Sequence, residues 1–341
     1  MQKLEIKNIK GKKYLYIKYK DKVNNKSISK LLYVGRLEKM TLSDFMVKLN
    51  KLHTIKLTNF IDFWISKSHQ HLDDQKIHTL ELIHYNYLLF KSQFPDELKI
   101  YNNSVFVHYV QGTTAIEGNT ITQKQANELL EHGITPPGKS LREVYEIVNF
   151  KKLNEFLVHF EGDLSEKTIQ KIHAMIMEQL LESAGDYRKI QILIEKAEHE
   201  PPPAFEVHEL MTQLTGWYRQ HRENMHPFEL AVLLHTKFVT IHPFVDGNGR
   251  VARALLNFVL EKNDYPKLYI GLEDRNTYLD AVAEGNKGNY QPVINFMYTV
   301  FTTQHELIKV NGDTRFTSEN INEFPEMNEL LNQFLKLKSS L

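Results

Sequence analysis

The spacing of hydrophobic residues changes along the chain and predicts a small β region followed by a longer helical one. Over 14–20 and 27–34, apolar or aromatic side chains are interleaved with lysine and serine, which is typical of two strands with a turn at 21–26. From about residue 41, apolar positions recur every three or four residues, the spacing of a helix that buries one face. The sequence therefore predicts a mainly α-helical fold with a small β appendage.

The same spacing, together with breaks in it, predicts the later helices. Prolines and a glycine at 135–138 interrupt the pattern, and Ser140 is a favourable first cap for the helix that follows. The predicted helical segments are 77–89, 101–117, 123–131, a segment around 144–153, 164–182, 207–222, 228–240, 278–300 and a last one from about 326.

Composition excludes several classes of protein. The sequence contains no cysteine, so disulfides, thiolate catalysis and cysteine-based zinc sites are excluded. It contains no apolar stretch near the roughly 20 residues that a membrane helix needs. Its first residues lack the apolar core of a signal peptide. We therefore expect a cytoplasmic enzyme.

Charge is distributed unevenly although the total is zero. Residues 1–60 contain 15 Lys and Arg against 4 Asp and Glu, a net charge of +11, so the remainder carries −11. Lysines interleaved with tyrosines could bind nucleic acid. More often such residues form the solvated face and edge of a small sheet, where lysine discourages aggregation. Both interpretations stay open, and the second is favoured.

The most informative stretch is 241–253, Ile-His-Pro-Phe-Val-Asp-Gly-Asn-Gly-Arg-Val-Ala-Arg. Its proline biases the residue before it toward extended backbone, so we expect His242 in a loop. Gly247 and Gly249 permit positive φ and close approach of a ligand to the backbone. An apolar helical run follows. The glycine turn would thus lie at a helix N-terminus, where unpaired N–H groups and the helix dipole favour an anion.

Charged side chains in this stretch suit a polyphosphate. Arg250 and Arg253 are three residues apart, so their guanidinium groups can share one helical face and hold phosphate oxygens. Asp246 is an acid among phosphate-binding groups, which is typical of a Mg²⁺ ligand. His242 can accept a proton from an attacking hydroxyl at neutral pH. Together these groups predict attack by an alcohol on a nucleotide phosphorus.

Residues 242–253 resemble the Fic motif, His-Pro-Phe-x-Asp/Glu-Gly-Asn-Gly-Arg-x-x-Arg, at every fixed position. The resemblance implies a Fic helical bundle and transfer of AMP from ATP to a Ser, Thr or Tyr hydroxyl of a target protein. Relatives that transfer phosphate or phosphocholine usually depart from Gly-Asn-Gly-Arg or from the flap described below. This sequence keeps Gly-Asn-Gly-Arg, which favours AMP. The implied roles are His242 as catalytic base, Asp246 as Mg²⁺ ligand, Gly247, Asn248 and Gly249 at the α-phosphate, and Arg250 and Arg253 at the β- and γ-phosphates.

An upstream segment at 113–118, Thr-Thr-Ala-Ile-Glu-Gly, resembles the inhibitory motif of the same family, Ser/Thr-x-x-x-Glu-Gly/Asn. The resemblance implies that Glu117 pairs with Arg253 and blocks the γ-phosphate pocket. Because Glu117 precedes the Fic motif, the inhibitory helix would be N-terminal and intramolecular. Without that motif, Glu-Gly would indicate only a common helix end.

A third resemblance precedes the motif. Apolar residues at 190–194 predict a strand, and the prolines at 201–203 end it. Fic proteins have a β-hairpin flap here, which covers the nucleotide and pairs with an extended segment of the target protein. The resemblance implies that Ile194 contacts the nucleotide, although an ordinary surface hairpin has the same local features. Further along, Tyr278 and Asn286 match family positions that border the adenosine.

These observations give one reading of the whole chain. The predicted regions are a basic β-hairpin appendage at 1–36, an N-terminal helical region at 37–100, a Fic domain with its inhibitory helix at 101–305, and a tail with a short helix at 306–341. We expect a protein adenylyltransferase that uses ATP and Mg²⁺ on an unidentified target protein and is held back by Glu117. Two alternatives are removal of AMP by the same fold, and a nucleic-acid-binding regulator that acts through the basic N-terminus. Homodimer formation is left open, and no membrane contact is expected.

Overall fold

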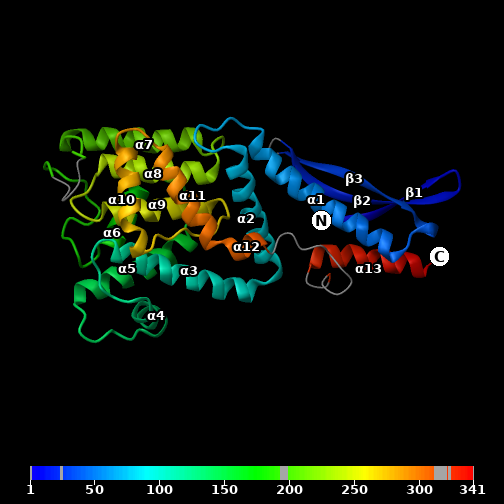
Figure 1. Cartoon of the computed structure of the whole chain (residues 1–341), viewed down its shortest axis with the longest axis horizontal. Coiled ribbons are helices and arrows are strands. Elements are labelled where there is room, and N and C mark those ends of the chain that lie inside the picture. The colour runs from blue at the N-terminus through cyan, green and yellow to red at the C-terminus, as the bar shows by residue number, and fades with distance from the viewer. Residues whose placement is uncertain (1, 24–25, 193–198, 311–320, 322–323, 341) are drawn as a thin grey trace. The chain divides into compact units, whose positions relative to one another are not determined.

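The computed structural model describes residues 2–23, 26–192, 199–310, 321 and 324–340. Its contacts divide the chain into two units. One unit comprises Met1–Ser68, Ile77–Pro95 and Leu307–Leu341, and the other His69–Lys76 and Asp96–Glu306. The elements of both are labelled in Figure 1. The division into four regions that the sequence predicted, at 1–36, 37–100, 101–305 and 306–341, stays a prediction.

The first unit contains the only sheet among the described residues, an antiparallel one. Its strands are β1 (Lys3–Ile9), β2 (Lys12–Val23) and β3 (Lys26–Arg36), in the order β1-β2-β3. The two strands predicted from alternation are confirmed. Strand β1 was not predicted, because its few apolar positions lie in a segment dominated by lysine and asparagine.

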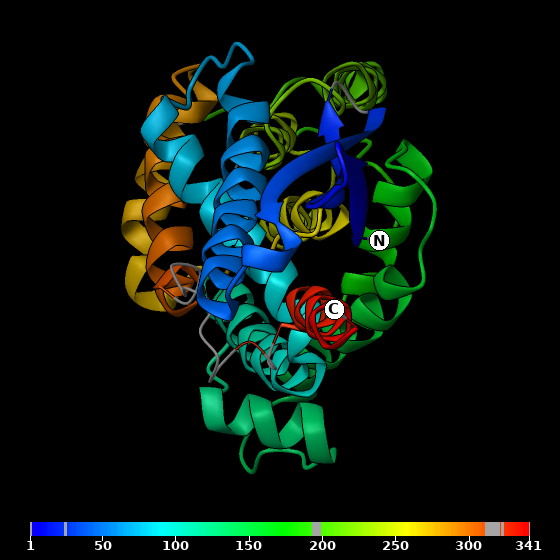
Figure 2. The same cartoon turned by 90° about the vertical axis from the view of Figure 1, so that its right-hand side faces the viewer.

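One face of the sheet packs on helices α1 (Leu42–Ile65) and α13 (Pro325–Ser339) (Figure 2). Leu15, Ile17 and Val34 are buried there, and Phe45 of α1 stacks on Phe334 of α13 with ring centroids 4.2 Å apart. Burial of these apolar side chains stabilises the unit. Both helices were predicted. The remaining elements of the unit are η1 (Leu37–Lys39), α2 (Asp74–Gln93), whose first residues belong to the other unit, and α12 (Glu306–Val310).

The second unit is helical. Helices α8 (Pro227–Ile241) and α9 (Asn248–Lys262) lie in its middle, and nearly all their residues are buried, as expected for helices enclosed by others. The surrounding elements are α3 (Pro95–Ala115), α4 (Gln123–His132), α5 (Leu141–Val158), α6 (Glu166–Ile176), η2 (Ala204–Glu206), α7 (Val207–His221), η3 (Leu272–Asp274), α10 (Arg275–Asn286) and α11 (Gln291–Gln304).

The local signals for helix ends hold in some places and fail in others. Ser140 caps α5 with a reciprocal capping box to Glu143, as predicted. The helix predicted at 164–182 ends at Ile176, and Gln179 beyond it has a positive φ of 61°. The helix predicted at 278–300 is two helices, because Gly288 (φ 88°) turns the chain before α11.

No helix in the described part of the chain is both long and apolar enough to cross a bilayer.

Candidate active site

The motif loop joins the C-terminus of α8 to the N-terminus of α9. His242 is the C-cap of α8, with φ 51° and ψ 58°, and its N–H donates to the carbonyl of Phe238. The expected loop position is confirmed, but the extended backbone is wrong: His242 is left-handed, a conformation that lets it close the helix with this bond. Gly247, at φ 81°, begins α9 without any side-chain cap.

The His242 imidazole is mostly buried and neutral at pH 7. Burial and, to a smaller extent, the Arg188 guanidinium lower its pKa to about 4, while the Val239 carbonyl and the Glu117 carboxylate act in the opposite direction. Its Nδ1 has no hydrogen-bond partner among the described residues. A neutral imidazole can accept a proton, which a general base requires.

Two glycines at the N-terminus of α9 let neighbouring side chains lie close to its first backbone amides. The first N–H groups of a helix have no partner within it and favour an anion. A Cβ atom at Gly249 would lie 2.5 Å from Glu117 Oε1 and 3.1 Å from Arg253 Nη1. A Cβ at Gly247 would lie 2.7 Å from the sulfur of Met177. We call the N-terminal amides of α9 around Gly249 the cradle.

Asn248 shapes the loop through its side chain. Its Oδ1 accepts from the N–H of Phe244 at 2.9 Å, and its Nδ2 donates to the carbonyl of the same residue at 2.8 Å. The carboxamide is buried and both its polar atoms are engaged. These bonds fix the orientation of the carboxamide and leave the second Nδ2 hydrogen outside this pairing.

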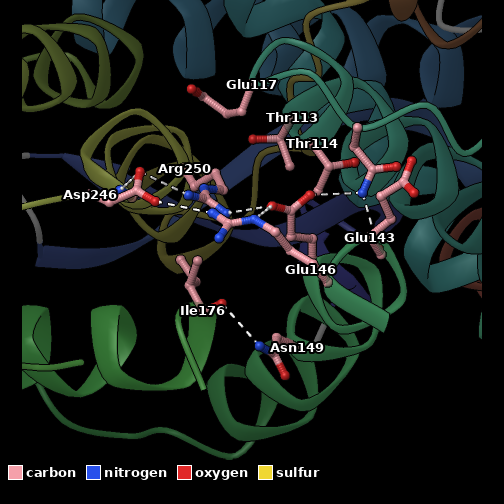
Figure 3. A network of polar contacts seen from close by, with 12 residues as sticks. Thr113, Thr114, Glu117, Glu143, Glu146, Asn149, Ile176, Asp246 and Arg250 are labelled. Atoms are coloured by element: carbon pink, nitrogen blue, oxygen red, sulfur yellow. Dashed lines mark hydrogen bonds and ion pairs between the residues drawn. The ribbon is translucent and has the colours of Figure 1, made fainter. Parts of the chain in front are cut away.

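Asp246 and Arg250 face each other at the rim of the cradle (Figure 3). Arg250 Nη2 lies 3.1 Å from Asp246 Oδ1, which also accepts from the N–H of Gly247 at 2.6 Å. Arg142 on α5 reaches the other carboxylate oxygen at 3.4 Å. These positive partners hold the pKa of Asp246 below its usual range although partial burial opposes them. Asp246 is thus ionised, and its side chain is 47% exposed.

Arg253 is the buried partner of the predicted inhibitory residue. Its Nη2 donates to Glu117 Oε1 at 2.7 Å and to the Thr113 carbonyl at 2.9 Å, and its Nε donates to the Thr113 hydroxyl at 2.7 Å. Tyr278 and Glu117 hold its pKa above the usual range despite burial. The structure therefore contains the ion pair that the resemblance implied.

Glu117 lies in the turn that ends α3. The N–H groups of Glu117 and Gly118 donate to carbonyls in the last turn of α3, and Arg275 holds the carbonyl of Ile116 at 2.9 Å. The Glu117 side chain remains 35% exposed. Its carboxylate lies beside Gly249 at the N-terminus of α9.

Glu146 on α5 connects the inhibitory segment to the motif (Figure 3). Its Oε1 lies 3.4 Å from Arg250 Nη1. Its Oε2 accepts a hydrogen bond at 2.8 Å from Nδ2 of Asn119, which is two residues after Glu117. Arg250 is 3% exposed in its side chain, and its Nε has no partner among the described residues. Glu146 thus supplies a buried counter-charge to this arginine.

We expect Glu146→Gln to lower the free energy of unfolding by about 2–3 kcal/mol, because the buried Arg250 charge loses one of its carboxylates. Glu143→Gln on the same helix is the matched control. Glu143 is half-buried, and its side chain only caps α5 and holds Thr120, so a loss of about 1 kcal/mol is expected. Urea unfolding curves measure both, and equal losses would contradict the role given to Glu146.

Two buried residues that sequence reasoning did not assign hold the loop in place. His173 on α6 bonds the Asp246 carbonyl through Nε2 at 3.0 Å, accepts from the Gly185 N–H through Nδ1, and stacks on Phe244. Arg188 donates from Nε to the His242 carbonyl at 2.9 Å. No pattern marked His173. Arg188 lies in the segment that leads to the predicted flap, which was a usable signal.

The segments that flank the predicted flap are fixed beside the motif loop. Arg188 also donates to the carbonyls of Ile190 and Pro202, and His199 lies 2.8 Å from the Thr240 carbonyl. Of the strand predicted at 190–194, residues 190–192 are described and form no strand, while residues 193 and 194 lie outside the described residues. The nucleotide contact of Ile194 and the hairpin itself stay predictions.

Tyr278 and Asn286, which were predicted to border the adenosine, both lie on α10. Tyr278 is 2% exposed, and its hydroxyl lies 2.8 Å from His235 Nε2 and 3.4 Å from Arg253 Nη1. It braces Arg253 and has little surface for a ligand. Asn286 is half-buried and accepts from the Thr240 hydroxyl at 2.9 Å, two residues before His242.

Besides His242, three histidines of this unit have a pKa lowered by burial, and they predict a fall in stability with acid. Burial lowers the pKa of His173 and His305 to about 4 and that of His235 to about 3. Between pH 6.5 and 4 the unfolded chain therefore binds protons that the folded chain does not. Each histidine should lower the free energy of unfolding by about 1.4 kcal/mol for each pH unit by which the pH falls across this range. We expect melting temperatures to fall steadily from pH 6.5 to 4.5, and less steeply in His305→Asn.

The donors present at the cradle fit Mg²⁺ with a phosphate ligand. No group of three or more acidic or histidine side chains that could enclose a metal occurs among the described residues. Mg²⁺ often binds to one or two carboxylates, with phosphates and water as its other ligands. Asp246 offers one ionised, half-exposed carboxylate at the cradle rim, which suits such an ion.

Fold and site define a helical domain in which a glycine-containing loop at a helix N-terminus follows a mostly buried histidine. Residues 163–260 match the Fic/DOC family. The chain is 33% identical over 199 residues to the protein adenylyltransferase Fic of Nematostella vectensis and 31% identical over 206 to that of Culex quinquefasciatus. These alignments cover 56% and 59% of this chain but only 46% and 41% of the relatives, so the chain spans less than half their length.

Solved structures show the same fold. A Fic-domain signalling protein of Bacteroides thetaiotaomicron is 26% identical with a TM-score of 0.63, over 70% of this chain and all of the other. A Fic family protein of Desulfovibrio desulfuricans is 22% identical with a TM-score of 0.61, over 79% and 89%. The predicted fold class, a helical Fic bundle with a small sheet, is confirmed.

Proposed function

We propose that this protein transfers AMP from ATP to a hydroxyl group of a target protein. The observation that carries the proposal is the arrangement at the N-terminus of α9. There a neutral His242, an ionised Asp246 and the buried Arg253 gather about unpaired amides. The printed names of the aligned relatives support AMP as the transferred group.

His242 would act on the attacking hydroxyl. The hydroxyl oxygen forms a bond to the α-phosphorus of ATP, the bond from that phosphorus to the bridging oxygen breaks, and diphosphate leaves. The neutral imidazole takes the hydroxyl proton. The charge of the bound phosphates would raise the pKa of His242 from its low value in the free protein, which strengthens the base.

The cradle would hold the phosphates. Amides at the start of α9 suit the α-phosphate, and Arg250 and Arg253 suit the phosphates beyond it. Asp246 would hold Mg²⁺, which when bound neutralises phosphate charge. Each arginine already has a carboxylate partner in this structure, so a phosphate must compete with Asp246 or Glu117.

Glu117 would keep the enzyme inactive. Its carboxylate occupies one guanidinium nitrogen of Arg253 and the space beside Gly249. A γ-phosphate placed there would meet a like charge at close range, which is unfavourable. ATP would then bind poorly, or with its α-phosphate out of line with the attacking hydroxyl.

The target protein would bind as an added strand at the flap. The support is local: Arg188 and His199 fix the segments on either side of 193–198 next to the motif loop. A strand of the target there would bring its hydroxyl close to His242.

Mass spectrometry of the Glu117→Gly variant after incubation with ATP and Mg²⁺ tests the proposal. An adenylyl group on this protein or on another protein in a lysate is the expected product. A second reaction, with a pre-modified protein and metal but no ATP, detects AMP removal instead. The absence of adenylyl transfer from this variant, with the purified protein folded, would reject the function.

A further inference from the structure

The sheet of the first unit has one open face, and its residues are fixed by strand register. Leu15 and Ile17 point into the core, so Tyr14, Tyr16 and Lys18, which alternate with them on β2, lie on the other face. Directly paired residues share a face. The residues paired with these three add Lys3, Glu5 and Lys7 from β1 and Leu31, Tyr33 and Arg36 from β3 to that face, which thus carries one carboxylate among its cations. We call this set of nine residues the tyrosine face.

The three tyrosine rings of this face form one aromatic cluster. The ring of Tyr33 lies 5.4 Å from that of Tyr16 and 6.4 Å from that of Tyr14, centroid to centroid. Tyr33 is 48% exposed, and the other two are partly exposed. Stacked or tilted aromatic rings at a solvated sheet surface can receive further flat rings.

Lysines surround the rings. The Lys7 ammonium lies 4.9 Å from the centre of the Tyr16 ring. Lys3 and Lys18 are a direct cross-strand pair, and like charges opposite each other are unfavourable without an anion. Within the described part of the chain, neither of these two lysines pairs with a carboxylate. This concentration of charge lies within the strongly basic segment 1–60.

We propose that the tyrosine face binds single-stranded nucleic acid. Exposed rings stack on unpaired bases of any sequence, and lysines around them neutralise the backbone phosphates. A duplex keeps its base faces stacked inside and would use only the lysines. A protein partner fits less well, because lysine is depleted at the centre of protein interfaces.

Fluorescence anisotropy of the full chain with a labelled twelve-nucleotide oligo-dT tests the site. We expect binding at 50 mM salt that weakens roughly 20- to 50-fold at 200 mM, as three to four phosphate contacts require. Tyr33→Ser should lower affinity about 5- to 100-fold, because one stacking platform is lost. Tyr33→Phe keeps the ring and should stay within about twofold.

Charge controls separate this face from general attraction to a polyanion. Lys7→Gln should reduce the salt slope by about 0.7. Lys124→Gln, on α4 and 87% exposed in its side chain, should leave the slope unchanged. No binding at 50 mM salt would overturn the proposal, and so would equal affinity of Tyr33→Ser and the parent with both folded by circular dichroism. Binding to vesicles rich in phosphatidylserine without binding to the oligonucleotide would assign the face to a membrane surface instead.

Discussion

His242→Ala is expected to lower the rate of AMP transfer by about 10²- to 10⁴-fold, the usual contribution of a general base. The reason is that no other group described at the cradle can accept the proton: Asp246 is already held by two arginines. The rate is measured as labelled AMP incorporated into protein, in a Glu117→Gly background so that the parent rate is high. Affinity for ATP, measured by calorimetry, should change little because the imidazole does not hold phosphate.

A second His-Pro-Phe in the chain provides the matched control. His226 caps α8 by accepting from the N–H of Phe228, far along the helix from the cradle. His226→Asn retains a cap acceptor and removes the imidazole. It should lower the melting temperature but leave the transfer rate of the folded protein unchanged. Equal loss of transfer in both variants would mean that the effect of His242 is structural.

The motif loop was predictable because its geometry is local. A proline after His242, a glycine before α9 and an apolar run after it determine a helix end, a turn and a helix start within a few residues. The left-handed conformation of His242 was not predictable from these rules. It depends on a bond to Phe238 and on carbonyl contacts from Arg188 that the local sequence does not specify.

The residues that support the loop could not be predicted, because they are distant in sequence. His173 is 73 residues from its partner Asp246, and Glu146 is 104 residues from Arg250. In the sequence, His173 and Glu146 look like ordinary polar positions on amphipathic helices. Only packing of α5 and α6 against α9 gives them their roles. For the same reason the sequence could not show that Tyr278, predicted to border the adenosine, is buried with its hydroxyl against Arg253.

The two motif arginines differ in how much must move before they bind phosphate. Arg250 is paired with Asp246, and phosphate joined through Mg²⁺ could share that carboxylate without displacing it. Arg253 is paired with Glu117, whose carboxylate lies against the cradle itself. Two bonds from Arg253 to Thr113 do not involve Glu117, so this guanidinium stays in place if the acid leaves. Inhibition should therefore depend on one side chain.

Glu117→Gly is expected to raise ATP affinity by roughly 10- to 100-fold, since a charged hydrogen bond of about 1.5–3 kcal/mol no longer competes for Arg253. Affinity is best measured by calorimetry in the His242→Ala background, where ATP is not consumed. Labelled AMP incorporation by Glu117→Gly with His242 intact should rise by at least the same factor. The free variant should melt at a lower temperature, because the buried Arg253 has lost its only carboxylate among the described residues, and ATP should restore part of the loss.

Glu117→Gln separates charge from space in this inhibition. The amide keeps the size of the carboxylate and can still accept from Arg253, but it removes the negative charge beside Gly249. If repulsion of the γ-phosphate dominates, Gln should behave nearly as Gly. If occupation of the Gly249 space dominates, Gln should remain close to the parent, because a Cβ there would already lie 2.5 Å from the glutamate oxygen. Identical ATP affinity in the parent and in both variants would show that Glu117 does not inhibit, while leaving the transfer chemistry of His242 intact.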